Sequence, residues 1–143
     1  MADRMSLSIE EWKALSASGR LELEVVSDSM YPTLRVGDVI KVRPLGDALP
    51  GKGMVTVFYK EGVPPLVVHR CLGNMRFRGD NRLNDDPPVS KRQLVGYVEE
   101  LIRNGRCVKV DGSGLIKLHR AGRRCLIRLT VLAGKLKRLV KRR

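Results

Sequence analysis

Two polar segments of the chain carry the side chains that nucleophilic catalysis requires. The serine segment, residues 27–38, places two serines two positions apart, ahead of a proline and a Gly-Asp pair. The downstream segment contains His69, Asp80 and Asp86. A serine, a histidine and an aspartate can serve as nucleophile, general base and orienting acid in any chain order, because such centres are defined by their geometry. Serine, proline and glycine are also the usual residues of turns, so the downstream segment is what favours catalysis.

The order and spacing of these residues resemble the type I signal peptidase family. The first matching block, Ser-x-Ser-Met-x-Pro-Thr-Leu-x-x-Gly-Asp, begins at Ser27, and the second is a strand that contains His69 and Arg70. The third block is Gly-Asp-Asn from Gly79, followed by further aspartates. The resemblance covers about residues 25–98 and is strongest to the branch that uses a histidine where other branches use a lysine.

The resemblance implies a role for each residue of the site. It makes Ser29 the nucleophile and His69 the general base, with the later acid, Asp86, as the preferred orienting group and Asp80 as a supporting acid. It also implies that the Ser29 backbone N–H and the Ser27 hydroxyl stabilise the oxyanion that forms during acyl transfer.

The residues themselves give a separate indication of which acid lies near the histidine. Gly73-Asn74, between two apolar runs, is typical of a two-residue hairpin turn. That turn would place His69 opposite Arg78, with Asp80 one diagonal step away on the same face of the sheet. This register favours Asp80, whereas the resemblance favours Asp86, and the choice between them stays open at this point.

The apolar periodicity predicts a mostly β protein. Alternating runs indicate a curled, partly closed antiparallel β fold, which the resemblance makes one of signal-peptidase type. A capping box at residues 8–11 predicts one short helix over residues 9–17. The seven expected strands cover residues 20–26, 38–43, 54–59, 66–72, 75–78, 93–102 and 106–110.

Charge divides the 143-residue chain into unequal parts. Residues 112–143 hold 11 of the 28 Lys and Arg and no Asp or Glu, and their leucines recur at helical spacing. We therefore expect an N-terminal helical arm (1–19), a β peptidase domain (20–111) and a basic amphipathic C-terminal tail with a helix (112–143). The tail predicts contact with an anionic membrane or packing on the body. Nucleic acid is a weaker expectation because the tail has no aromatic residue to stack on bases.

Cysteine content and hydropathy suggest where the protein works. Three cysteines without metal-ligand spacing favour reduced thiols, so we expect no metal and no cofactor. We expect neither a signal peptide nor a transmembrane helix, because charged residues near the start interrupt any apolar run. These features predict a cytoplasmic protein, with peripheral membrane contact through its tail.

The predicted function is that of a serine endopeptidase that cleaves a leader or signal segment from a precursor peptide. Lack of a spanning helix would distinguish the chain from membrane-anchored signal peptidases, so a cytoplasmic processing peptidase fits the sequence equally well. Self-cleaving SOS repressors are also similar, but they use a lysine base. The alternative prediction is a non-catalytic β binding module whose basic tail binds an anionic membrane or nucleic acid.

Overall fold

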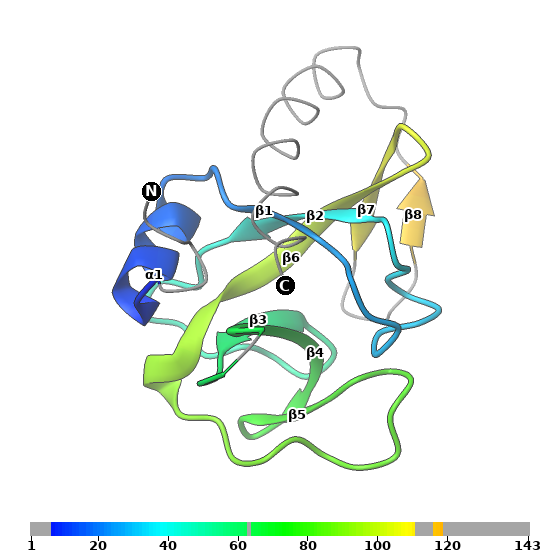
Figure 1. Ribbon diagram of the computed structural model, residues 1–143. Helices are drawn as coiled ribbons and strands as arrows, with labels where there is room; N and C mark the ends of the chain where they lie inside the picture. The colour runs from blue at the N-terminus through cyan, green and yellow to red at the C-terminus, as the bar shows by residue number, and fades with distance from the viewer. Residues whose placement is uncertain (1–6, 63, 111–115, 119–143) are drawn as a thin grey trace.

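A computed structural model describes residues 7–62 and 64–110 of the chain, and the backbone of 116–118 (Figure 1). The expected mostly antiparallel β architecture is confirmed, with one short α-helix among the described residues, and the sheet there does not close. The elements in chain order are α1 (Ile9–Ala17), β1 (Glu22–Glu24), β2 (Val39–Arg43), β3 (Val55–Tyr59), β4 (Leu66–Gly73), β5 (Arg76–Arg78), the 3-10 helix η2 (Lys91–Gln93), β6 (Leu94–Arg103), β7 (Arg106–Val110) and β8 (Ile116–Leu118).

Helix α1 begins where the capping box predicted. The Ser8 hydroxyl accepts a hydrogen bond from the Glu11 N–H at 3.3 Å, and the Glu11 carboxylate accepts one from the Ser8 N–H at 2.7 Å. These two bonds satisfy N–H groups that a helix start would otherwise leave unpaired. Trp12 and Ser16 lie one turn apart and are buried where α1 packs against β6 and β2.

Strand β6 joins the two halves of the sheet. The strand order is β1-β2-β6-β3-β4-β5, and β7 pairs with the last residues of β6 on the edge opposite β2. At the crossing point, Tyr97 of β6 lies opposite Arg43 of β2 on one side and opposite Thr56 of β3 on the other. Strand pairing between the β1–β2 half and the β3–β4–β5 half therefore runs only through β6 among the described residues (Figure 1).

A glycine permits this close packing. A Cβ on Gly96 would lie 2.2 Å from the Arg43 carbonyl oxygen and 2.9 Å from the Ser16 hydroxyl oxygen. The first contact is with backbone, which cannot turn aside as a flexible side chain could. Gly96 thus lets β2 and α1 approach β6 together.

We expect Gly96→Ala to lower the free energy of unfolding by about 1–3 kcal/mol or more, as overpacking of cores generally does. Urea denaturation should show a lower midpoint with an unchanged slope. Gly51→Ala is the matched control, because a Cβ there meets nothing within 4 Å. Equal midpoints for the two variants would contradict the close approach at Gly96.

The two predicted hairpins had different outcomes. The turn at Asn104 and Gly105 is confirmed, with Arg103 opposite Arg106. The turn predicted at residues 73–74 is wrong: the strands are joined through Asn74 and Met75, both with positive φ, and a bulge displaces the register between Cys71 and Gly73. The displaced turn alone would put Cys71 opposite Arg78, and the bulge moves that pairing back by one residue, so Arg70, and not His69, lies opposite Arg78.

The sheet also continues past residue 111. Strand β8 pairs with β7 within the segment that the sequence assigned to the basic tail. The predicted amphipathic helix falls on residues 119–143, outside the described residues. Within the described part of the chain, each helix is too short or too polar to cross a lipid bilayer.

Candidate active site

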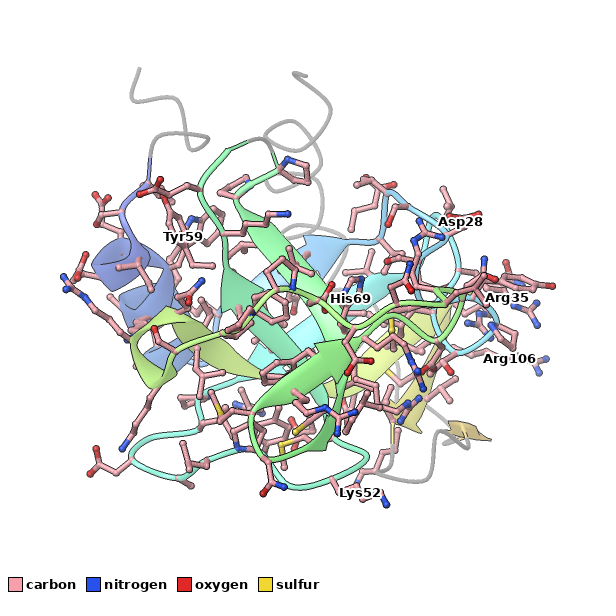
Figure 2. The ribbon with its side chains drawn as sticks, turned by 90° about the horizontal axis from the view of Figure 1, so that it is seen from below. Asp28, Arg35, Lys52, Tyr59, His69 and Arg106 are labelled. Carbon is pink, nitrogen blue, oxygen red and sulfur yellow. The ribbon has the colours of Figure 1, made fainter. Side chains whose placement is uncertain are left out.

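Three elements bring the predicted site residues together. The serine segment connects β1 to β2, and His69 lies in the middle of β4, where it pairs with Thr56 of β3. Asp86 belongs to the aspartate segment, residues 79–86, which follows β5. Figure 2 shows His69 near the centre of the molecule, with Asp28 of the serine segment toward one side.

His69 is bonded to Asp86. The His69 Nδ1 lies 2.5 Å from the Asp86 Oδ2, and the two side chains are 11% and 20% exposed. The Asp86 N–H donates to the Phe77 carbonyl oxygen at 2.7 Å, which ties the aspartate segment to β5. Since a carboxylate accepts hydrogen bonds, this contact assigns a proton to Nδ1 and leaves Nε2 free to accept one from another group.

The Nε2 atom faces the serine segment across Gly79. A Cβ built on Gly79 would lie 3.1 Å from His69 Nε2 and 2.5 Å from the Ser29 carbonyl oxygen. The same oxygen accepts a hydrogen bond from the Asn81 N–H at 2.9 Å. The aspartate segment therefore passes directly beside Ser29, and the missing side chain at Gly79 leaves that space open.

The hydroxyl of Ser29 points to a neighbouring serine in this structure. Its Oγ lies 3.2 Å from the Ser27 Oγ, at hydrogen-bonding distance. No hydrogen bond joins Ser29 to His69 within the described part of the chain. In serine enzymes such hydrogen bonds often form only when substrate is present, so this geometry is compatible with a site that holds no substrate.

Asp80 has different partners from those the hairpin register suggested. Its carboxylate accepts two hydrogen bonds from Arg70, at 2.8 and 2.7 Å, and one from the Thr33 hydroxyl at 2.5 Å. The predicted register, which placed Asp80 one diagonal step from His69, is wrong. Asp86 is the acid that contacts His69, and Asp80 links β4 to the serine segment.

These partners stabilise the ionised form of the Asp80 carboxyl group. Burial alone would raise the pKa of this carboxyl. The hydrogen bonds from Arg70 and Thr33, with the electrostatic effects of Arg70 and, to a smaller extent, His69, outweigh burial and bring the pKa below its ordinary value of 3.8. The Asp80 side chain is thus held as a carboxylate between two parts of the site.

We expect Asp80→Asn to lower the free energy of unfolding at pH 7 by about 1–3 kcal/mol, because Arg70 loses its partner in a site where both side chains are mostly buried. A carboxyl group whose pKa is lower in the folded than in the unfolded protein stabilises the fold at pH values above its pKa in the unfolded protein. That contribution is lost as the pH falls through its pKa in the folded protein. The difference between wild type and the variant should therefore narrow below about pH 4.

Urea denaturation at pH 7 and at acid pH measures this effect. Asp85→Asn is the matched control, because Asp85 pairs with Arg76 and Arg78 in the open, where an ion pair contributes little. A constant gap between wild type and Asp80→Asn from pH 7 to 3 would contradict the role of the Asp80 charge.

A second ion pair, between Arg103 and Asp38, fixes the end of the serine segment to β6. It was not predicted from the sequence. Arg103 of β6 donates to both carboxylate oxygens of Asp38, at 3.0 and 2.7 Å, and to the Thr33 carbonyl oxygen at 3.1 Å. The Asp38 side chain is only 3% exposed and also accepts from the Arg35 N–H. The sequence motif included Asp38, but nothing in the spacing identified an arginine 65 residues away.

Comparison of the chain with protein family models, with curated proteins and with solved structures gave no significant match. Within the described residues, no group of three or more His, Cys, Asp or Glu side chains is arranged to hold a metal ion. The geometry of this chain and the motifs of its sequence are therefore the basis on which a function can be proposed.

Proposed function

We propose that the protein is a serine endopeptidase with Ser29 as nucleophile, His69 as general base and Asp86 as the orienting acid. The contact between His69 Nδ1 and Asp86, with Nε2 turned toward the serine segment, is the observation that supports this most directly. Nucleophile, base and orienting group are the parts that acyl transfer requires. In this proposal the open β sheet is of signal-peptidase type.

Catalysis would begin when the Ser29 Oγ turns from Ser27 and attacks the peptide carbonyl carbon. His69 Nε2 takes the hydroxyl proton, and Asp86 stabilises the imidazolium that results. Collapse of the tetrahedral intermediate breaks the C–N bond, and His69 returns the proton to the leaving amine. His69 then takes a proton from water, which attacks the acyl ester and releases Ser29.

The developing oxyanion needs hydrogen-bond donors that are already in place. The Ser29 N–H is available for this, since it donates to no other described residue. The Ser27 hydroxyl, 3.2 Å from the Ser29 Oγ, is the second donor in this proposal. Its hydrogen bond to Ser29 in the resting site would be exchanged for one to the oxyanion.

The proposed substrate is a precursor peptide or protein from which a leader or signal segment is removed. The buried free thiol of Cys71 supports a reducing compartment, so this proposal places the reaction in the cytoplasm. Incubation of the purified full chain with precursor peptides, followed by mass spectrometry, tests the proposal. Cleavage by the wild type but not by Ser29→Ala supports it, and cleavage by both or neither opposes it.

The concentration of cations in residues 112–143 favours a second function, in which the tail binds an anionic membrane surface. The tail would then either bring the peptidase to its substrate or be the main activity of a non-catalytic module. Sedimentation with anionic vesicles tests membrane binding independently of peptidase activity. The Ser29→Ala variant should bind the vesicles as the wild type does, and binding should weaken as the salt concentration rises.

A further inference from the structure

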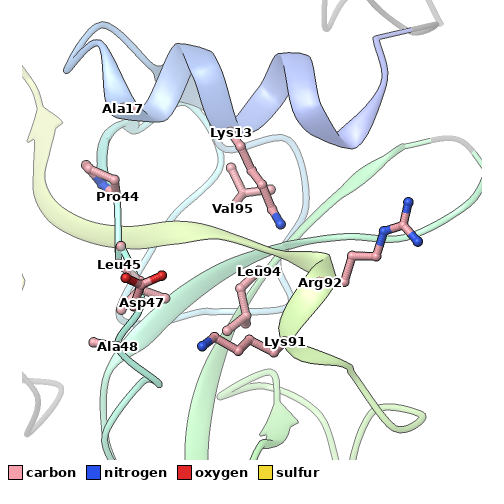
Figure 3. A pocket seen from close by; sticks show the side chains of 11 residues that line it. Lys13, Ala17, Pro44, Leu45, Asp47, Ala48, Lys91, Arg92, Leu94 and Val95 are labelled. Atoms are coloured by element: carbon pink, nitrogen blue, oxygen red, sulfur yellow. The ribbon is translucent and has the colours of Figure 1, made fainter.

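A cavity of about 510 Å³ lies at the end of β2 that is remote from the serine segment (Figure 3). It is bounded by α1, by the 44–48 loop that follows β2, by η2 and by the first residues of β6. The serine segment precedes β2 and this loop follows it, so a five-residue strand of about 17 Å separates the two regions. The cavity is therefore no part of the proposed active site.

Positive charge predominates at this cavity. Lys13, Lys91 and Arg92 line it, with Asp47 as the one acid among its lining residues. Neither lysine forms an ion pair with another residue in the described part of the chain. Arg92 lies 3.8 Å from Glu10, but those side chains are 82% and 67% exposed, so their pairing is weak and easily exchanged.

The two lysines reach the cavity from different elements. Figure 3 shows the Lys13 side chain extending from α1 toward Leu94, and the Lys91 side chain extending toward the 44–48 loop, whereas Arg92 points away. An anionic group between Lys13 and Lys91 would pair charges that have no partner among the described residues.

The floor of the cavity is apolar and firmly held. Leu94 and Val95 of β6 are 7% and 4% exposed. Leu94 belongs to the core cluster of Phe58 and Phe77, whereas Val95 belongs to the core cluster of Trp12. Because these two side chains are almost fully buried, the apolar surface open to a ligand comes mainly from the other apolar lining residues, Ala17, Pro44, Leu45 and Ala48.

We propose that the cavity binds one small amphiphilic anion, namely an acyl chain that ends in a carboxylate. The chain would lie against the more exposed apolar lining, mainly Pro44, Leu45 and Ala48, and the carboxylate would lie between Lys13 and Lys91. The volume falls in the range of about 300–1,000 Å³ that is usual for small-molecule sites. A simple inorganic anion would leave this apolar lining uncovered, and an uncharged chain would leave the lysines unpaired. This proposal does not depend on the peptidase activity.

Calorimetric titration of the full chain tests the proposal with three probes. Decanoate has both chain and charge, decanol has the chain alone, and inorganic phosphate has the charge alone. We expect decanoate to bind at least about tenfold more tightly than either, since each of the others lacks one of the two contributions. Decanoate should also raise the melting temperature, because it binds the folded state.

Substitutions locate the binding. Lys13→Gln and Lys91→Gln should each weaken decanoate binding by about three- to tenfold, whereas the exposed Lys60→Gln, on the β3–β4 connection, is the matched control and should leave it unchanged. Ala48→Trp at the exposed rim should block the cavity, and Ser29→Ala should bind decanoate as wild type does.

Three results would overturn the proposal. They are the absence of decanoate binding, equal binding of decanol and decanoate, and decanoate binding that survives both lysine substitutions. The lysine variants decide the question even if Ala48→Trp disturbs the fold, because both lysines reach solvent and form no ion pair within the described residues.

Discussion

Replacing Ser29 with alanine is expected to lower kcat/KM for peptide cleavage by at least about 10³-fold, because the group that forms the acyl ester is then missing. Thermal unfolding should be unchanged, since the only side-chain hydrogen bond of Ser29 among the described residues is with exposed Ser27. Ser90→Ala, at an exposed serine that precedes η2, is the control and should keep full activity.

His69→Ala should cause a loss of similar size. Members of a catalytic unit act together, so the double variant Ser29→Ala/His69→Ala should be hardly slower than either single variant. Peptide cleavage measured on all four forms gives the test. Multiplicative losses in the double variant, or full activity in either single one, would show that these residues do not form one catalytic centre.

Asp86→Asn is expected to lower kcat by up to about 10⁴-fold with little change in KM. An amide can donate to Nδ1, which would put the proton on Nε2 and remove the base. The matched control is Asp85→Asn, since the adjacent carboxylate pairs with exposed Arg76 and Arg78 instead of the imidazole. Nitrogen NMR of His69 should show the change of tautomer in the first variant and not in the second.

The two candidate acids can be separated by the same measurements. Asp80→Asn removes the partner of Arg70 but leaves the bond between His69 and Asp86 in place. It should therefore retain the wild-type tautomer and lose activity only as far as it loses folded protein. If Asp80→Asn changed the tautomer and Asp86→Asn did not, the assignment of the orienting acid would be reversed.

Local signals in the sequence were sufficient for α1 and for strands β1 to β7, but not for β8. The capping box at Ser8 placed the helix start, and alternation placed the strands to within a few residues, because both depend on neighbouring residues alone. Asn104-Gly105 gave the correct turn because both residues readily adopt positive φ. Met75, at φ 57, is a residue for which no sequence rule predicts that conformation, and the neighbouring hairpin was misplaced as a result.

Contacts between distant parts of the chain could not be predicted in the same way. The pairing of Asp38 with Arg103 depends on the register of β2 on β6, which shifts at a bulge between Lys41 and Val42. The bond between Arg70 and Asp80 depends on the bulge in the β4–β5 hairpin. Periodicity identifies which residues face the core, but a bulge of one residue changes every pairing beyond it.

The central position of β6 has a consequence for the newly made protein. The serine segment belongs to the β1–β2 half, and His69 and Asp86 belong to the half that contains β3, β4 and β5. Both halves are synthesised before the strand that joins them, and β2 and β3 do not pair with each other. On the ribosome, each half can form its local hairpins while the other remains unattached. A peptidase built in this way would complete its site late in translation, because β6 pairs with both halves and Arg103, at its end, binds Asp38 of the serine segment.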